Sequence, residues 1–464
     1  MNKLNDMELS VVVLAAGQGS RMKSPLSKVL HLLGDKPLLE HVLSAARTLN
    51  PQQIIIIHGA DGEKLKQALP DPSLTWALQS PPKGTGDALA KALPVIPALH
   101  RVLVLYGDVP LISADTLKQL LDKTPANSVG LLTAFVENPY GLGRIIRQHD
   151  KVTQIIEERD ANCEQRQIKE INTGILVAPV QALFDWIPQL KSHNAQGEYY
   201  LTDIISMASA QNINVITHHP SHFSEILGVN DRVQLNELER LYQSEKAKAW
   251  LKDGIKIADP QRIDVRGPLH LEQDVEIDIN VIFEGTNVLR KGAKIGAHCV
   301  LINCDVGENV TVLPFCHLEG VRLEKDAKVG PFARLRPGTV LGNSARVGNF
   351  VEVKNATIGE HSKINHLSYI GDTTMGKDVN VGAGVITCNY DGAQKHQTII
   401  EDNVHIGSDT QLVAPVRVGE GATIAAGTTL RKDAPAHQLT LTQQISQRSS
   451  KHWKRPSKTS GNEG

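Results

Sequence analysis

The sequence predicts an α/β protein in two parts, a layered N-terminal domain with a mostly parallel sheet and a parallel β-helix of hexapeptide repeats. Two observations carry this prediction. In the first half of the 464 residues, short uninterrupted apolar runs alternate with stretches of helical pattern. In the second half, long runs carry an aliphatic residue at every sixth position. A period of six fits neither an amphipathic helix nor a single strand, but it is typical of a solenoid with stacked coils.

Three apolar runs in the first half predict buried strands, at residues 10–14, 54–57 and 101–105. None of them alternates apolar with polar residues, which indicates strands covered on both faces, as in a parallel sheet. Helical patterns at 38–49 and 88–93 lie between the runs. Because ligands of such sheets bind at the carboxyl ends of the strands, we expect the loops after Leu14, Gln79 and Leu105 to face one crevice.

A charged helical stretch at 233–253 separates the two halves, and Gly254 follows it as a stop signal. This stretch is either a linking helix or the last helix of the first domain. We therefore expect a first domain over 1–232, a linking helix over 233–253, and the β-helix with a C-terminal tail over 254–464.

The longest six-residue ladders run from Ile263 to Val281, from Leu323 to Val353 and from Ile400 to Leu430. Glycine often follows a ladder residue, and we expect it at corners that need a left-handed backbone or a close approach of two coils. The polar stretch 387–398 interrupts the ladder. A loop that leaves a regular solenoid is typically functional, so this stretch is a candidate binding loop.

The composition excludes several classes of protein. Lys and Arg number 49 and Asp and Glu 50, so the net charge of −1 provides no field to attract nucleic acid or an anionic membrane. No uncharged apolar run reaches the ~18 residues of a membrane span, and Asp6 and Glu8 precede the first apolar run, unlike in a signal peptide. The five cysteines form no CxxC pair and their number is odd, which favours a reducing compartment. We expect a cytoplasmic protein without a nucleic-acid partner or stable membrane association.

Residues 14–22 (LAAGQGSRM) follow the first predicted strand. Their glycines allow backbone N–H groups to approach an anion, and Arg21 and Lys28 are cations suited to a triphosphate. Taken alone, G-x-G is more often an ordinary strand-to-helix turn.

Asp108 ends the third predicted strand. A carboxylate at this edge of the sheet usually contacts a phosphate through Mg²⁺. The alternative is that Asp108 is an ordinary turn or cap residue. Residues 84–87 (GTGD) are a second candidate ligand loop or a capped turn.

In the second half, His366 lies two residues after the ladder residue Ile364. A neutral imidazole at this position can accept a proton from an amine that attacks a thioester. Taken alone, a histidine in a solenoid is more often a surface or packing residue. Arg336 and Lys354 are suitable partners for a phosphate group.

Several ordered motifs make the chain similar to a known family. Besides those above, they are residues 140–144 (YGLGR), 170–174 (EINTG), 228–231 (GVND), 363–372 (KINHLSYIGD) and 386–392 (ITCNYDG). Over nearly all of its length the chain resembles the bifunctional bacterial N-acetylglucosamine-1-phosphate uridylyltransferase/glucosamine-1-phosphate N-acetyltransferase family. The resemblance implies a Rossmann-like nucleotidyltransferase domain and a left-handed β-helix. It also implies a homotrimer that uses UTP, acetyl-CoA and Mg²⁺, and that acetylates glucosamine-1-phosphate before uridylyl transfer to N-acetylglucosamine-1-phosphate.

The resemblance assigns a nucleotide-sugar site residue by residue. Arg21 and Lys28 would be catalytic cations on the phosphates, and Asp108 and Asn230 would hold Mg²⁺. The residues that would contact the UDP-sugar are Leu14, Ala15, Ala16, Gly17, Lys28, Gln79, Gly84, Thr85, Tyr106, Gly107, Asp108, Gly143, Glu157, Asn172 and Asn230. Ser27 departs from the family pattern, which usually has proline there, and we expect the serine to loosen the loop.

The resemblance also assigns an acetyl-transfer site, in which His366 matches the general base. The residues that would bind glucosamine-1-phosphate are Arg336, Lys354, Tyr369 and Asn380. Those that would contact acetyl-CoA are Ala383, Asn389, Tyr390, Ser408, Ala426 and Gln443. Gln443 stands where the family has an arginine for the phosphates of the cofactor, which is a second departure from the pattern.

Two other functions account for only part of the sequence. One is a nucleotidylyltransferase whose β-helix merely assembles subunits or binds a regulator, but it leaves the motifs at 363–366 (KINH) and 389–392 (NYDG) unexplained. The other is a solenoid scaffold with a degenerate front domain, which would not need the cations and metal ligands of the first half.

Overall fold

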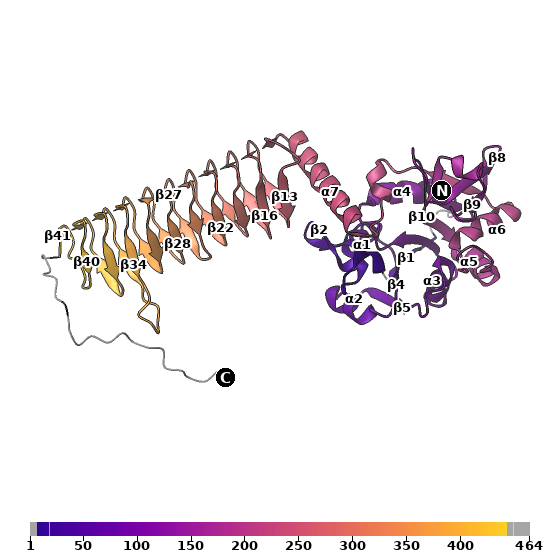
Figure 1. Cartoon of the computed structure of the whole chain (residues 1–464), viewed down its shortest axis with the longest axis horizontal. Helices are drawn as coiled ribbons and strands as arrows, with labels where there is room; N and C mark the ends of the chain where they lie inside the picture. The colour runs from indigo at the N-terminus through magenta and orange to yellow at the C-terminus, as the bar shows by residue number, and fades with distance from the viewer. Residues whose placement is uncertain (1–6, 18, 443–448, 450–464) are drawn as a thin grey trace. The chain divides into compact units, whose positions relative to one another are not determined.

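The computed structural model describes residues 7–17, 19–442 and 449. The chain forms two compact units, Met1–Lys246 and Ala247–Gly464 (Figure 1). No helix in the described part of the chain is long and apolar enough to cross a membrane.

The division between the units lies inside helix α7 (Arg232–Lys252), which occupies the stretch where a linking helix is expected. The two ends of this helix pack on different cores. Leu238 is buried in a core of the first unit, and Ala247 is buried in the core of the second. The domain limits at 232 and 253 stay predictions.

A nine-stranded mixed sheet forms the centre of the first unit. Its main path, in spatial order, is β11 (Val215–His218), β7 (Val129–Phe135), β10 (Glu170–Pro179), β6 (Arg101–Tyr106), β1 (Leu9–Ala15), β4 (Gln53–His58) and β5 (Leu74–Leu78). β1 pairs in parallel with β6 and β4, whereas β10 runs antiparallel to β6 and β7. A hairpin of β8 (Arg144–Gln148) and β9 (Lys151–Ile156) branches from β10. The three predicted strands are therefore adjacent and parallel.

Both faces of this sheet are covered, as its apolar runs predict. Along β1, Val11 and Val13 belong to one apolar core, while Val12 and Leu14 belong to the other. The first core is completed by α1 (Leu38–Thr48), α2 (Gly62–Ala68) and α4 (Ala114–Lys123), and the second by α3 (Thr85–Ala92), α5 (Val180–Trp186) and α6 (Ile204–Ala210). The absence of polar alternation in the strands thus reflects their place between two helical layers.

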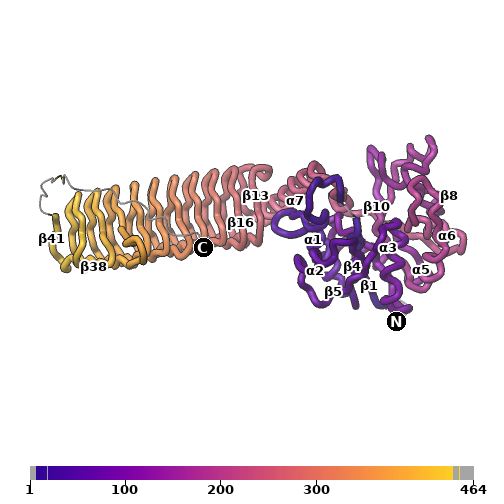
Figure 2. Tube along the Cα trace, turned by 60° about the horizontal axis from the view of Figure 1, so that its bottom comes forward, coloured from indigo at the N-terminus to yellow at the C-terminus, as the bar shows by residue number. Residues whose placement is uncertain are grey.

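The second unit is a parallel β-helix (Figure 2). Its strands, from β12 (Lys256–Ile257) to β41 (Leu439–Thr440), form three parallel sheets of 11, 10 and 9 strands. Successive strands belong to different sheets, and from β15 to β40 each strand pairs with the strand three places earlier in the chain, whereas β41 pairs with β39. One column of stacked, buried ladder residues consists of Ile295, Val312, Val329, Val347 and Ile364. A six-residue repeat therefore corresponds to one sheet, and one coil takes 17 or 18 residues.

Two glycines that follow ladder residues, Gly348 and Gly359, allow neighbouring coils to approach each other closely. A Cβ on Gly348 would lie 2.0 Å from the carbonyl oxygen of Asn365, and one on Gly359 would lie 2.3 Å from the backbone of Gly376. Neither glycine has a left-handed backbone, whereas Asn355, at a corner, does, with φ of 46°. For these two glycines close approach is therefore the reason that applies, whereas Gly330, which also follows a ladder residue, has a left-handed backbone with φ of 97°.

One coil is longer than its neighbours. The paired residues Ile364 and Val381 are 17 residues apart, but the next pair, Val381 and Ile406, is 25 apart. The additional residues form a loop between β34 (Ile386–Cys388) and β35 (Thr398–Ile400), which extends away from the stack (Figure 1). This loop is the stretch where the sequence ladder is interrupted.

A column of aromatic rings runs along one corner of the β-helix. His298, Phe315, Phe332 and Phe350 all have a left-handed backbone, and their rings stack with centroid separations of 4.9, 5.0 and 5.3 Å. The three phenylalanines remain about half exposed, at 50, 47 and 57%. Leu367, next along the same corner, is also exposed. The corner therefore presents a continuous apolar surface.

Replacement of Gly359 by alanine is expected to destabilise the β-helix by about 3 kcal/mol, because the new methyl group would overlap backbone atoms of the next coil. Gly427 offers the matched control. No atom of the described part of the chain lies within 4 Å of its Cβ position, so alanine there bears only the strain of its φ of 71°, about 1 kcal/mol. Circular dichroism of thermal unfolding measures both variants. Equal unfolding midpoints would contradict close approach as the reason for Gly359.

Candidate active sites

The carboxyl ends of β1, β5 and β6 lead into loops that enclose a cavity of about 230 Å³. Ten of the fifteen residues predicted to contact the UDP-sugar line it: Leu14, Ala15, Ala16, Gly17, Lys28, Gln79, Gly84, Thr85, Tyr106 and Asp108. The sequence prediction missed four other lining residues, Val29, Pro82, Ala88 and Glu198. The first three are close in sequence to predicted residues, but no motif marks Glu198.

Two cationic side chains meet two oxygen-bearing side chains at this sheet edge. Lys28 forms an ion pair with Asp108, and its Nζ lies 3.4 Å from Asn230 Oδ1. Arg21 Nη2 donates to the same Asn230 oxygen at 2.9 Å. The carboxylate of Asp108 and the amide oxygen of Asn230 therefore converge on one ammonium group.

The described residues hold no cluster of three or more His, Cys, Asp or Glu side chains that could bind a metal ion. A divalent cation held by Asp108 and Asn230 would therefore need further oxygen ligands from a substrate or from water. This is the usual situation of Mg²⁺, which keeps several water or phosphate ligands.

Backbone contacts bring Asp108 and Asn230 together although they are far apart in sequence. Asp108 follows β6, and Asn230 precedes α7. The backbone N–H of Val229 donates to the carbonyl oxygen of Asp108 at 2.9 Å, which joins the two segments. The backbone N–H of Asn230 donates to Gln234 Oε1 at 2.8 Å, so the first turn of α7 also positions this residue.

Two small residues determine the position of Lys28, which begins the short helix η2 (Lys28–Leu30). A Cβ on Gly19 would lie 2.7 Å from Lys28 Cβ, and the φ of Gly19 is 59°, so this position requires glycine. Ser27 has a φ of −54°, within the range of proline, so the backbone keeps the path that the family's proline would set. The buried Ser27 hydroxyl has no partner among the described residues, which costs about 1 kcal/mol or more.

The other five predicted contact residues are Gly107, Gly143, Glu157, Asn172 and Asn230. The Asn172 N–H donates to the Gly143 carbonyl at 2.8 Å, and a Cβ on Gly143 would lie 3.2 Å from Glu157 Oε2. Burial raises the pKa of Glu157. Burial also raises the pKa of Tyr106, and the charges of Glu157 and Asp108 raise it further. Tyr106 therefore lies near both carboxylates, that of Glu157 in this second group and that of Asp108 in the cavity.

In the second unit, His366 ends β30 (Lys363–His366) and is paired with Asn349, the last residue of β27 (Arg346–Asn349), on the previous coil. Asn349 Oδ1 lies 2.9 Å from His366 Nδ1. With the Asn349 amide in this orientation its oxygen can only accept, so the contact fits the tautomer that carries its proton on Nδ1 and has Nε2 as the basic nitrogen. The sequence prediction missed Asn349, although the coil length of 17 residues points to it.

Three of the residues predicted to contact acetyl-CoA share a column with His366. Each member of this column lies two residues after one of the paired ladder residues Ile364, Val381, Ile406 and Ile424. The column consists of His366, Ala383, Ser408 and Ala426. The coils that follow His366 therefore present only small side chains there. Gln443 lies outside the described residues.

The predicted phosphate partners lie mainly in the neighbouring sheet. Arg336 Nη1 donates to Glu352 Oε1 at 3.0 Å, and Glu352 is paired with Tyr369 in β31 (Tyr369–Gly371). Lys354 ends β28 (Glu352–Lys354). Asn380 lies instead in the sheet that contains β30. Within one chain, the structure therefore groups Arg336, Lys354 and Tyr369, and leaves Asn380 on another face.

The sequence prediction also missed Lys395, which belongs to the protruding loop. Its ammonium lies against that of Lys354, and this contact lowers the pKa of Lys395. The carboxylate of Asp372 also lies near both lysines, so the three side chains together keep one positive charge with which an anion can pair. The sequence alone does not bring these residues together, because the loop interrupts the period that relates the other positions.

Internal hydrogen bonds hold the loop in a hairpin. Tyr390 and Lys395 form a β-bridge, and His396 Nε2 lies 2.7 Å from Asp391 Oδ2. The backbone N–H of Gln394, followed by the His396 side chain, lowers the pKa of Asp391. Asn389 is 7% exposed, and its amide donates to Asp372 at 2.5 Å. These contacts place the lysine of the loop beside the sheet that contains Lys354.

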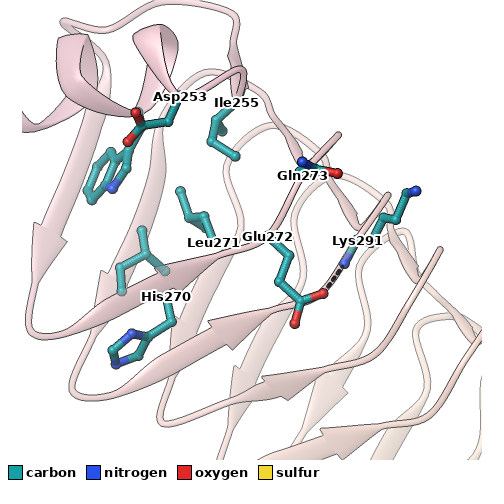
Figure 3. A pocket seen from close by; sticks show the side chains of 9 residues that line it. Asp253, Ile255, His270, Leu271, Glu272, Gln273 and Lys291 are labelled. Atoms are coloured by element: carbon teal, nitrogen blue, oxygen red, sulfur yellow. Dashed lines mark hydrogen bonds between the residues drawn. The ribbon is translucent and has the colours of Figure 1, made fainter.

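A second cavity, of about 590 Å³, lies at the first coils of the β-helix and contains none of the predicted residues (Figure 3). Trp250, Asp253 and residues around β14 (Leu269–Leu271) line it. Glu272 Oε2 accepts a hydrogen bond from the backbone N–H of Lys291 at 2.9 Å. No buried polar side-chain atom among these described lining residues lacks a partner, so the cavity indicates no particular ligand.

Comparisons with known proteins cover both units. Residues 11–258 match the family of MobA-like NTP transferase domains, and residues 397–432 match the bacterial transferase hexapeptide family, of six repeats. Proteins named "Bifunctional protein GlmU" are similar over almost the whole chain. Those of Herminiimonas arsenicoxydans, Azoarcus sp. (strain BH72) and Aromatoleum aromaticum are 51, 52 and 51% identical over 450, 451 and 456 residues. These alignments cover 97, 97 and 98% of this chain and 99, 100 and 100% of the relatives.

Replacement of Lys395 by methionine is expected to weaken the binding of inorganic phosphate to the full chain about tenfold, because it removes one of the cations that would face the anion. Lys377→Met, at another corner of the β-helix, is the control and should leave phosphate binding unchanged. Isothermal titration calorimetry measures both. Equal affinity in the Lys395 variant and the parent would show that the two lysines do not form an anion site.

Proposed function

We propose, from the premise that the chain belongs to the family of bifunctional GlmU proteins, that it catalyses two consecutive steps of UDP-N-acetylglucosamine synthesis. The second unit transfers the acetyl group of acetyl-CoA to the amine of glucosamine-1-phosphate. The first unit then transfers a uridylyl group from UTP to N-acetylglucosamine-1-phosphate and releases pyrophosphate. Incubation with UTP, Mg²⁺, acetyl-CoA and glucosamine-1-phosphate, omitting each in turn, tests the whole proposal. Free thiol should require only acetyl-CoA and glucosamine-1-phosphate, whereas pyrophosphate should require all four.

The observation that carries the uridylyl assignment is the convergence of the Asp108 and Asn230 oxygens on the Lys28 ammonium. A position that already holds one cation between a carboxylate and an amide oxygen fits Mg²⁺, which prefers oxygen ligands. Asp108 and Asn230 would hold this ion, and when bound it would neutralise charge on the phosphates of UTP. Lys28 would then be free to contact a phosphate.

Uridylyl transfer needs no strong base, because the phosphate of the sugar is already a nucleophile at neutral pH. One of its oxygens attacks the α-phosphorus of UTP. The bond from that phosphorus to the oxygen that bridges the α- and β-phosphorus atoms breaks, and pyrophosphate leaves. Arg21 and Lys28 stabilise the negative charge on the phosphates during this step. Among the described residues, nothing lies within 4 Å of the Cβ position of Gly17, so a ligand can approach the backbone there.

Asp108→Asn is expected to lower uridylyl transfer about 10³-fold, because it keeps the size of the side chain and removes the charge that holds the metal. Acetyl transfer should be unchanged, since its site lies in the other unit. Pyrophosphate release at a fixed Mg²⁺ concentration measures the first activity, and thiol release from acetyl-CoA measures the second. Normal uridylyl transfer at ordinary Mg²⁺ would contradict the role of Asp108.

For acetyl transfer, the contact of His366 Nδ1 with Asn349 supports His366 Nε2 as the general base. Nε2 takes a proton from the amine of glucosamine-1-phosphate as the nitrogen attacks the thioester carbon. The bond from that carbon to sulfur then breaks, the protonated His366 returns its proton to the sulfur, and CoA leaves as the thiol. Lys354 and Lys395, with Arg336, would hold the phosphate of the sugar.

The column that begins at His366 supports a path for acetyl-CoA. Ala383, Ser408 and Ala426 would contact the cofactor along successive coils, and Asn389 and Tyr390 of the loop would contact it near the sugar. The family's arginine is replaced by Gln443, so the other residues would bind the cofactor without that ionic contact.

A homotrimer would complete the acetyl-transfer sites. The exposed aromatic column lies one residue beyond the column of His366, and it is the kind of apolar surface that a second subunit covers. Asn380, which lies on another face of the same chain, would then belong to the site of a neighbouring subunit. UTP and acetyl-CoA are cytoplasmic metabolites, and all five cysteines are free, so we place the enzyme in the cytoplasm.

His366→Ala is expected to lower acetyl transfer about 10³-fold, the usual contribution of a general base, and to leave uridylyl transfer unchanged. The two activities are measured separately, with glucosamine-1-phosphate and acetyl-CoA for one and with N-acetylglucosamine-1-phosphate and UTP for the other. A parallel fall of both activities would instead indicate damage to folding or assembly. Unchanged acetyl transfer would exclude His366 as the base.

A further inference from the structure

The amide of Gln79 is held in one orientation by two neighbours. Gln79 follows β5 directly and is 4% exposed. Its Nε2 donates to the carbonyl oxygen of Gly84 at 3.0 Å and to Asp87 Oδ2 at 2.8 Å. Asp87 lies in the first turn of α3, where no side chain caps the helix. The Asp87 carboxylate therefore accepts a hydrogen bond from Gln79 instead of capping the N-terminus of α3.

The chemistry of these two partners determines which end of the amide faces them. A backbone carbonyl and a carboxylate can only accept hydrogen bonds, so both require the NH₂ end of Gln79. The reversed amide would place its oxygen against two other oxygens. The other carboxylate oxygen of Asp87, Oδ1, lies 3.5 Å from Lys91 Nζ. The two acceptors therefore determine which end of the Gln79 amide is the NH₂ group and which is the oxygen.

Once Nε2 is engaged, Oε1 is the atom of Gln79 that remains for a ligand. Gln79 lines the nucleotide cavity, and no donor in the described part of the chain bonds its Oε1. A lone acceptor at this position matches a base that carries a ring N–H. Uracil has such a hydrogen at N3, whereas cytosine has a lone pair there.

We propose that Asp87 is a positioning residue for base selection: by holding the Gln79 amide with Oε1 available, it favours UTP over CTP. This inference rests on the proposed uridylyl transfer. Bound cytosine would place its N3 lone pair against the Gln79 oxygen, and both acceptors would be left without a partner. Without Asp87, only the Gly84 carbonyl would hold the amide, which could then turn its NH₂ towards N3 of cytosine.

The position of Gly84 limits how the rest of the loop can compensate. Its φ is 105°, and a Cβ there would lie 2.6 Å from the carbonyl oxygen of Tyr199. The path of the backbone, and with it the direction of the Gly84 carbonyl, therefore depends on glycine. The chain offers Asp87 as the side chain that can be changed without moving this backbone.

The test compares kcat/KM for UTP with kcat/KM for CTP in the full chain, by pyrophosphate release at saturating N-acetylglucosamine-1-phosphate and Mg²⁺. In Asp87→Ala the ratio should fall at least tenfold, and CTP should gain in absolute terms. Asp87→Asn should lie between Asp87→Ala and the parent, since its amide oxygen can still accept from Gln79. Lys91→Met removes the partner of Asp87 but keeps the carboxylate, and it should change the ratio less than twofold.

The ratio of kcat/KM for UTP to kcat/KM for CTP distinguishes a positioning role of Asp87 from a general loss of structure. A loosened helix would lower kcat/KM for both nucleotides together and leave their ratio unchanged. An unchanged ratio in Asp87→Ala, or a parent enzyme that uses UTP and CTP equally, would overturn the inference and leave uridylyl transfer standing. A parent that releases no pyrophosphate with UTP would overturn the proposed function itself.

Discussion

Parallel strand pairing in register is the constraint on which both candidate sites depend. In a parallel ladder the carboxyl ends of neighbouring strands lie at one edge, so the loops after β1, β5 and β6 open onto the same cavity. In the β-helix the same pairing recurs at every coil, and it brings Asn349 beside His366 and aligns His366 with the small residues of later coils. Residues far apart in sequence thus become neighbours through the backbone alone, and their side chains are left available for chemistry.

Both sites are rich in cations, and each set of cations includes one carboxylate. At the sheet edge Lys28 is paired with Asp108, and Arg21 donates to the neutral amide oxygen of Asn230. A nucleoside triphosphate with its own divalent cation brings both signs of charge, so its phosphates can contact Arg21 and Lys28 while the cation takes the place of Lys28 beside Asp108. At the β-helix, Lys354 lowers the pKa of Lys395, and the carboxylate of Asp372 lies near both lysines. Two lysines with one carboxylate leave one positive charge for a sugar phosphate to pair with.

Periodicity was sufficient to predict the two-part fold, and the family resemblance pointed to ten of the fourteen residues that line the cavity at the carboxyl ends of β1, β5 and β6. Apolar runs without alternation indicated strands such as β1, and the six-residue period indicated the β-helix. The residues that the prediction missed depend on contacts which a linear pattern does not contain. Asp87 reads as a helix cap in the sequence, but its carboxylate bonds Gln79. Glu198 lines the cavity from a loop without a motif. The role of Gly348 could not be predicted for a different reason. In the sequence, a glycine needed for close packing cannot be distinguished from one needed for a turn.

The protruding loop has a geometric reason within the β-helix. Neighbouring strands in a sheet are about 4.8 Å apart, so a side chain on a regular coil reaches the coil next to it but not the one beyond. Lys354 and Lys395 belong to coils separated by one full coil, that of β31, and only a chain that leaves the stack and returns can bring them together. Asp372, on the intermediate coil, accepts from Asn355 on one side and from Asn389 on the other, at 2.7 and 2.5 Å. The carboxylate of Asp372 thus connects three coils at the base of the protruding loop. These hydrogen bonds hold the loop at the place where it brings Lys395 beside Lys354.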